Sequence, residues 1–243
     1  ISNRVLITFL DKELFQRSVI DYFQASYMGA FAKYGFVFFL LIRISVFAQE
    51  SPQDSLIQNL SSLTGKEKVD SINALIRSIL YSRPDEAMEW AEKAIVLSGE
   101  IEYPEGKIMA QINQGVIYNG KALLDEAILA LSNAKSASSA IDYKYGLAYA
   151  NLSLTTVYIK QGNYDLAIEF AFLGVKASRE IDNSDLEISN FINLATIKIL
   201  LKDFPSAETY LLEAVKLAED NTEIWQGRLG QIYGNMAVVK SEL

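Results

Sequence analysis

Asparagines recur at one position of a sequence repeat, and their amides are the side chains best suited to recognition chemistry in this chain. Asn73, Asn113 and Asn193 share one phase of the repeat, Ser153 fills the gap, and Asn235 follows after a slightly longer step. We call the four asparagines the Asn row. Each amide both donates and accepts hydrogen bonds, which suits an extended peptide backbone that has no internal partners. Alternatively, these amides bond one another or the carbonyls of a neighbouring helix, and the sequence leaves both interpretations open.

Residues that commonly perform catalysis are missing from the sequence. The 243 residues include no Cys and no His, which excludes disulfides, thiolate nucleophiles and Cys-type zinc sites and removes the commonest general base. Neither an Asp-rich calcium loop nor a Gly-rich phosphate loop is present. We therefore expect no catalytic residues, no cofactor and no metal ion, and a protein that is not an enzyme.

Composition limits the fold and the partners. Half of the residues are hydrophobic, and the 4 Pro and 13 Gly are too few for a disordered chain or a turn-rich β fold. The net charge is −8, with Lys and Arg scattered along the chain. Nucleic acids bind basic stripes, so this charge disfavours a nucleic-acid partner.

A 40-residue period organises the chain and predicts stacked helical hairpins. Alanines mark one position of each unit: Ala87, Ala127, Ala167 and Ala207. Small residues follow seven positions later, at Ala94, Ala134, Gly174 and Ala214. This spacing places them on one face of an amphipathic helix, where a second helix can approach closely. We expect second helices of each unit to centre near Ala91, Leu131, Ala171 and Leu211, with turns at Asn119-Gly120 and Gln161-Gly162-Asn163 and acidic first-turn residues Asp85, Asp125 and Asp165.

The repeat resembles the tetratricopeptide repeat family. One unit follows the family pattern with Gln111, Gln114-Gly115, Tyr118, Ala127 and Leu131, and the next follows it with Asn151, Leu154-Thr155, Tyr158, Ala167 and Ala171. The family period is about 34 residues, so the longer period resembles the subclass found in cell-polarity scaffolds and in bacterial sensory and regulatory proteins. The resemblance implies an all-α solenoid of stacked antiparallel helix hairpins, with units of about 68–104, 105–144, 145–184 and 185–225 and a truncated fifth unit from 226.

In this family the first helix of each unit lines a concave groove that binds a protein or peptide. The resemblance places Asn73 and the following residues there: Met109, Ile112, Asn113, Val116 and Asn119; Tyr149, Leu152, Ser153, Thr156 and Lys160; Ser189, Ile192, Asn193, Thr196 and Leu200; and Asn235. Trp90 and Trp225 are expected to pack between helices or repeats rather than to anchor a partner.

The N-terminal part of the chain, up to position 65, differs from the repeats in composition. Residues 1–27 precede the first Met and are interpreted as an upstream extension, and residues 49–65 as a lead-in segment. Residues 28–48 resemble a signal peptide, with Lys33, an apolar stretch and a cleavage site after Ala48. A membrane anchor and an ordinary buried helix are the alternatives, and Arg43 interrupts the apolar stretch.

Together these features predict an exported interaction scaffold in the periplasm or at the membrane. The alternative is the sensory input region of a larger membrane-bound kinase, nucleotide cyclase or transcription regulator. A first residue that is not Met and a fifth unit without its second helix suggest a fragment. Membrane contact is expected only through the N-terminal segment or a missing C-terminal part.

Overall fold

A computed structural model of the protein describes residues 57–219 and 222–242. The predicted extension, the predicted export segment and the start of the lead-in segment lie outside the described residues. Within the described residues, no helix combines the length and hydropathy that a membrane crossing requires.

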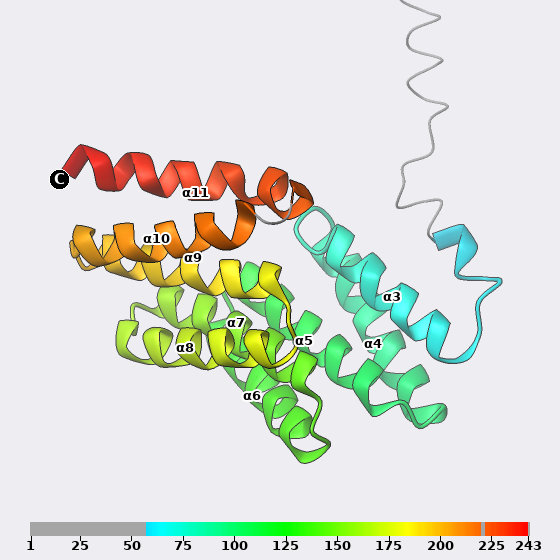
Figure 1. Ribbon diagram of the computed structural model, residues 1–243. Helices are drawn as coiled ribbons and strands as arrows, with labels where there is room; N and C mark the ends of the chain where they lie inside the picture. The colour runs from blue at the N-terminus through cyan, green and yellow to red at the C-terminus, as the bar shows by residue number, and fades with distance from the viewer. Residues whose placement is uncertain (1–56, 220–221, 243) are drawn as a thin grey trace, which may run out of the picture. The chain divides into compact units, whose positions relative to one another are not determined.

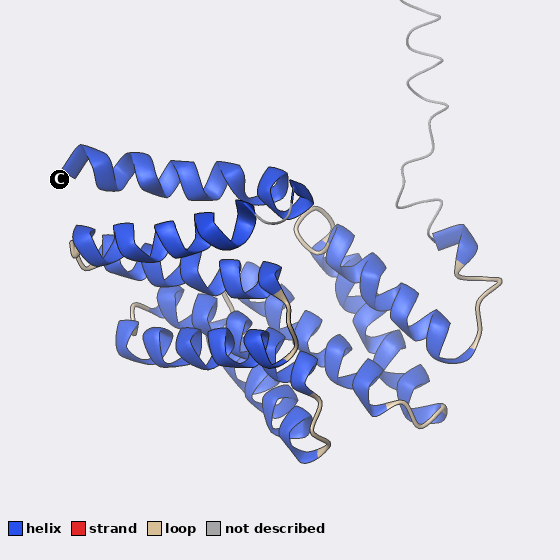
Figure 2. Cartoon of the chain, viewed as in Figure 1, coloured by secondary structure: helices blue, strands red, loops and turns tan. Residues whose placement is uncertain are grey.

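The described residues form helices and turns, with no strand among them (Figures 1 and 2). Residues 57–59 are helical. The helices that follow are α3 (Gly65–Ile79), α4 (Pro84–Glu100), α5 (Pro104–Gly120), α6 (Leu124–Ala140), α7 (Lys144–Gln161), α8 (Tyr164–Glu180), α9 (Ser184–Leu200), α10 (Phe204–Glu219) and α11 (Thr222–Glu242). Consecutive helices pack on one another along the chain. The all-α solenoid of helical hairpins is therefore confirmed.

Helix pairs form two layers. The first helices of the units are α3, α5, α7, α9 and α11, and each of them from α3 to α9 contacts the next one. The second helices, α4, α6, α8 and α10, contact only first helices within the described part of the chain. This pattern makes the first helices a continuous layer across which a groove can run.

Small residues set the distance between the layers. Ala87, Ala127, Ala167 and Ala207 are each fully buried, and the second helices centre where the sequence predicted. A side chain at Gly115 would place its Cβ 2.5 Å from Cγ of Leu131, so α5 and α6 are in close contact. The predicted acidic residues also occupy the first turns of α4, α6 and α8.

From the end of α4 onward, most helix junctions use one kind of turn, which occurs twice in each of the second and third units. Its central residue has a left-handed φ of 52–80° at Glu102, Ala122, Asp142, Gly162, Asp182 and Lys202. The next amide closes the helix end, as where Leu123 N donates to Tyr118 O at 2.9 Å. This is the hydrogen bond of a Schellman motif. The predicted turn at Asn119-Gly120 is shifted, because α5 continues to Gly120 and the turn lies at 121–123.

The first helices begin within four residues of the predicted starts of the units. Helices α5, α7 and α9 begin one residue before the predicted starts at 105, 145 and 185, and α3 begins at Gly65. Helix α11 begins at Thr222, four residues before the predicted start of the fifth unit.

Candidate functional site

A hollow of about 460 Å³ crosses the first-helix layer of the first three units. We call it the α3–α7 groove. Its lining comprises Arg77, Leu80 and Tyr81 from the end of α3 and the residues after it; Ile112, Asn113, Val116, Asn119 and Gly120 from α5; and Tyr149, Leu152, Ser153, Thr156 and Lys160 from α7. Except for Met109, the predicted groove residues of α5 and α7 lie together here. Met109 is instead buried, 7% exposed, in the core between α5, α6 and α7.

Helical spacing brings the lining residues onto one face. Ile112 and Val116 are four residues apart on α5, and Leu152 and Thr156 are four apart on α7, so each pair shares a face of its helix. Ile112 is almost fully buried and forms the floor, whereas Val116 and Leu152 are half-buried. The groove therefore has an apolar floor that a partner's side chains can contact.

Polar groups link the two main walls. Asn119 Nδ2 donates to Thr156 Oγ1 at 3.3 Å, and Thr156 Oγ1 donates to Ser153 O at 2.8 Å. Lys160 Nζ donates to Asn119 O at 2.5 Å. These bonds hold the C-terminal ends of α5 and α7 side by side and fix the groove's shape.

Tyr149 brings a neutral phenol to the groove. Burial, and then a hydrogen bond with Tyr145, raise the pKa of Tyr149, while the charge of Arg77 acts in the opposite direction. The rings of Tyr145 and Tyr149 are 4.8 Å apart between centroids. Tyr149 therefore carries no charge near neutral pH and contributes apolar surface and hydrogen bonding.

The Asn row does not form one continuous binding surface. Asn73 and Asn113 are each 3% exposed, and Asn113 Nδ2 donates to Asn73 Oδ1 at 3.0 Å. Asn73 Nδ2 in turn donates to Gly106 O at 3.0 Å. For this pair the structure favours the alternative interpretation, in which the amides bond one another. The physical reason is that they lie in the α3–α5 contact, where a buried amide needs a protein partner.

The remaining two asparagines differ from this pair. Asn235 Nδ2 donates to Thr196 Oγ1 at 3.2 Å, which links α11 to α9. Asn193 is half-buried, and its side chain makes no hydrogen bond to another described residue. The predicted α9 positions Ser189 and Ile192 are buried, and the α3–α7 groove includes neither of them.

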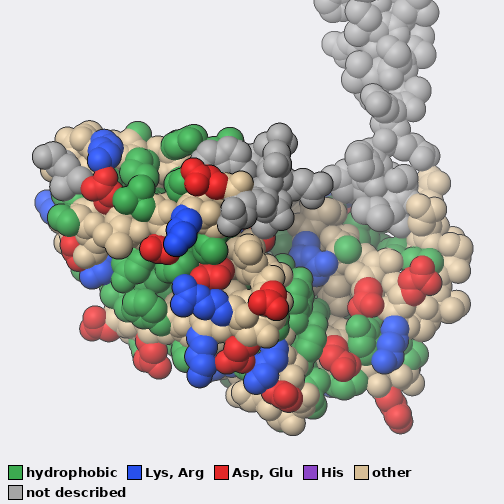
Figure 3. Space-filling model, viewed as in Figure 1, with side chains coloured by type: hydrophobic (Ala, Val, Ile, Leu, Met, Phe, Trp, Pro, Cys, Tyr) green, Lys and Arg blue, Asp and Glu red, His purple; other side chains and the backbone are tan. Residues whose placement is uncertain are grey.

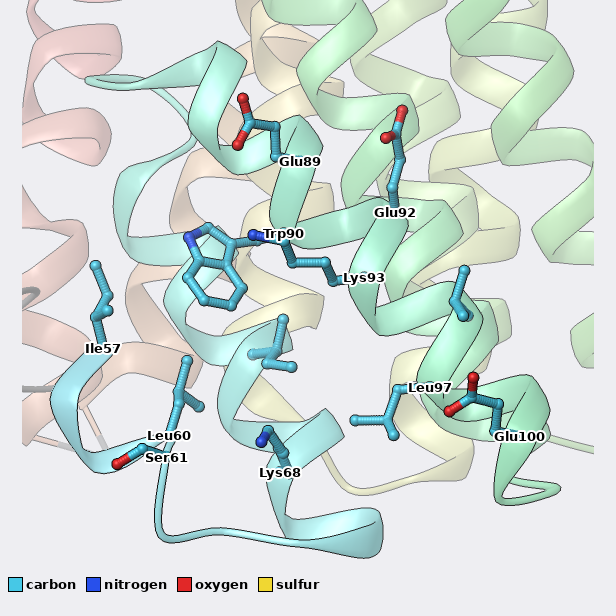
Figure 4. A pocket seen from close by; sticks show the side chains of 12 residues that line it. Ile57, Leu60, Ser61, Lys68, Glu89, Trp90, Glu92, Lys93, Leu97 and Glu100 are labelled. Carbon is cyan, nitrogen blue, oxygen red and sulfur yellow. The ribbon is translucent and has the colours of Figure 1, made fainter.

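A second hollow, of about 770 Å³, lies beside α4 at the start of the described chain (Figure 4). Trp90, Leu60, Leu97 and Lys68 are among its lining residues, with Glu89, Glu92 and Glu100 also on it. Trp90 packs against the core around α3 and α4, as the sequence predicted, and Lys93 Nζ lies 4.2 Å from its ring centroid. Side-chain placement is not described for Trp225.

Sequence reasoning missed this second hollow, although one signal was present. Val96 is 61% exposed on its rim. The corresponding positions of the later units are polar, at Ser136, Lys176 and Lys216. An exposed apolar residue at a position that is polar in the other repeats indicates that the surface of α4 differs from the surfaces of α6, α8 and α10.

Charges elsewhere are mixed. Figure 3 shows acidic and basic side chains interspersed over the visible face, with apolar side chains between them. No single-sign patch dominates that view.

Comparison with known proteins identifies the fold and no more. No family model matches the chain, and no curated protein matches it. Among solved structures, the crystal structure of BtubC (BKLC) from P. vanneervenii is similar, with a TM-score of 0.56 and 13% sequence identity. The similarity covers 80% of this chain and 89% of that one. At this identity it supports the all-α solenoid and carries no statement about function.

Proposed function

We propose that the chain is an exported interaction scaffold of the tetratricopeptide type, which binds an extended segment of a partner protein in the α3–α7 groove. One observation supports the proposal above the others: equivalent positions of α5 and α7, such as Ile112 with Leu152, converge beside the end of α3 on one hollow with an apolar floor. Binding sites of this kind are mostly apolar with a few placed polar groups.

The groove offers both kinds of contact that an extended segment needs. Val116 and Leu152 supply half-buried apolar surface for side chains. Tyr149 supplies a hydroxyl group at the same surface. Thr156 Oγ1 donates its proton to Ser153 O and accepts from Asn119, so it can offer a partner one remaining acceptor site. The groove's shape is held by the bonds between α5 and α7, so a partner would meet a largely preformed site, which lowers the entropic cost of binding.

A blocking variant tests the proposal. Gly120 lines the groove, and a Cβ there would meet no atom within 4 Å. We expect Gly120→Trp to place an indole in or beside the groove without clashing with the core. Gly99, near the end of α4, is equally open and lies outside the groove lining, so Gly99→Trp is the matched control.

The measurement is capture of partners from the source organism by the immobilised full chain. Identified partners are then cut into peptides, whose affinity is measured by fluorescence anisotropy. We expect Gly120→Trp to weaken peptide binding at least about tenfold, or about 1.4 kcal/mol, with an unchanged circular dichroism spectrum. If Gly120→Trp binds the peptides as tightly as the parent, the interaction lies outside the groove and the proposal is wrong. This conclusion holds whether or not Gly99→Trp changes binding.

A further inference from the structure

The α3–α7 groove is electrostatically unlike the rest of the chain. The protein carries a net charge of −8, yet among the described residues the charged side chains that line the groove are Arg77 and Lys160 alone. Both are exposed, and both are cationic. Resting on the proposed function, we infer that the segment bound in this groove is acidic, with carboxylates on both sides of a short apolar stretch.

Neither cation is neutralised by a carboxylate of the described chain. Arg77 makes no ion pair there, and the partner of Lys160 is the neutral carbonyl of Asn119. Some cations elsewhere pair with carboxylates, as where Lys121 pairs with Asp85 and Lys144 with Asp142. The groove cations are therefore free to attract a partner's charge.

Two acidic residues of the first helices, Asp70 of α3 and Asp185 of α9, already have partners. The phenol of Tyr103 donates to Asp70 Oδ1 at 3.0 Å. Arg228 donates to both oxygens of Asp185, each at 2.8 Å. Neither carboxylate lines the groove. The charge of Asp185 does act on Tyr149 in the groove, but the ion pair with Arg228 offsets that charge.

The C-terminal ends of the helices contribute negative charge at the groove, and this charge is smaller than the positive charge of Arg77 and Lys160 together. The C-terminal end of a helix acts like about half a negative elementary charge, so the ends of α3, α5 and α7 add up to roughly −1.5. Arg77 and Lys160 supply two full positive charges. The groove stays positive, and Lys160 meets part of the helix-end charge by binding the α5 carbonyl.

The positions of the two cations define the shape of the acidic segment. Arg77 is in the last turn of α3 and Lys160 is near the end of α7, whereas Ile112 and Val116 lie between them on α5. Helix α5 contacts both α3 and α7. A segment that crosses α5 would place apolar side chains on the floor and one carboxylate group at each flank.

Two designed peptides test this inference. Both are fluorescein-labelled nonapeptides with the centre Leu-Ser-Leu-Ser-Leu, flanked on each side by two Asp in one and by two Asn in the other. For the full chain in low salt, we expect the Asp peptide to bind on the order of tenfold tighter than the Asn peptide, because two weakly screened charge pairs form. Raising the salt concentration should reduce this preference.

Matched variants locate the effect in the groove. The double variant Arg77→Gln, Lys160→Gln should bind both peptides equally. The control Lys176→Gln, Lys216→Gln removes two exposed cations from α8 and α10 and changes the net charge by the same amount, so it should retain the preference. Circular dichroism checks that each variant is folded.

Several outcomes would overturn the inference. They are equal affinity of the parent for the two peptides, no binding of the Asp peptide at millimolar concentration, or an equal loss of preference in the control. If single-stranded oligodeoxythymidine binds more tightly than the Asp peptide, Arg77 and Lys160 serve to bind nucleic acid and the inference is wrong. If the Asn peptide binds equally well and Gly120→Trp blocks it, the proposed groove stands and only its acidic preference fails.

Discussion

At the scale of single residues, buried alanines determine how closely the two helices of each unit approach. Ala127 and Ala167 have no exposed surface, and each lies on the face of a second helix that packs against a first helix. Protein interiors are close-packed, so extra methylene groups at such a contact force side chains and backbone to shift.

We therefore expect Ala127→Leu and Ala167→Leu each to lower the free energy of unfolding by about 1–3 kcal/mol. Urea denaturation followed by circular dichroism measures the change. Ala140→Leu, at an exposed position of α6, is the control and should change stability by less than about 0.5 kcal/mol. Wild-type stability in both core variants would show that the assigned helix face is wrong.

A second prediction at this scale concerns the asparagines. Replacing a member of the buried pair should lower the free energy of unfolding more than replacing the half-buried Asn193. Asn113→Ala removes the donor to Asn73 Oδ1 and leaves that buried oxygen without a partner, which costs about 1–3 kcal/mol. Asn193→Ala breaks no hydrogen bond to a described residue and should cost less than about 0.5 kcal/mol. Thermal and urea unfolding of both variants measure this difference. A similar cost in both variants would contradict the distinction drawn between them.

At the scale of elements, the turns between helices carry backbone strain. A left-handed φ suits Gly, because its missing Cβ avoids a clash with the backbone. Only Gly162 meets this preference among the six recurring turn residues, whereas Ala122 adopts a φ of 61°. The backbone conformation of the turn is therefore determined by the packing of the helices on both sides and not by the preferences of the turn residues.

The strain predicts opposite effects at two equivalent turns. Ala122→Gly should raise the free energy of unfolding by about 0.5–1 kcal/mol, and Gly162→Ala should lower it by about 1 kcal/mol. Lys121→Gly, one residue before Ala122 at a φ of −79°, is the control and should not stabilise the protein. Chemical denaturation measures all three changes, and stabilisation by Lys121→Gly as well would mean that the effect is not specific to the left-handed residue.

The same turns explain what the sequence could and could not predict. The helix positions followed from the period of residues such as Ala87 and Ala127, because burial on one face requires a regular spacing. The turn after α5 was misplaced, because Asn119-Gly120 has the composition of a turn while the observed left-handed residue is Ala122. Local turn preferences fail where packing of neighbouring helices decides the backbone.

Prediction of the candidate site was limited in the same way. Repeat phase placed Val116, Tyr149 and Thr156 on the groove correctly, because phase determines which face a residue occupies. Phase does not determine how much of that face is buried by neighbouring helices. Met109 and the amides of Asn73 and Asn113 are therefore buried although their phase places them on the groove side. The cationic flank at Arg77 was missed, because it depends on which helices meet around the hollow.

At the scale of the whole array, each helix depends mainly on its neighbours along the chain. Stability in such a fold is approximately a sum of unit stabilities and nearest-neighbour contacts. Among the described helices, α11 packs only on α9 and α10. Its buried apolar side chains among those described are Ile232 and Val239, so polar bonds to α9 matter more there than in the middle units.

The bidentate pair between Arg228 and Asp185 joins α11 to α9, and it should determine how often α11 detaches. We expect Arg228→Ala to raise amide hydrogen exchange throughout α11, by on the order of tenfold, because a half-buried charge-assisted pair contributes about 1.5 kcal/mol or more. Exchange in α5 to α8 should stay unchanged, since these helices make no contact with α11 in the described structure. Hydrogen-exchange mass spectrometry resolves the helices individually, and Lys176→Ala on α8 controls for loss of a positive charge. A uniform rise across all helices after Arg228→Ala would show that the array unfolds as one cooperative unit, and no change in α11 would show that apolar packing alone holds it in place.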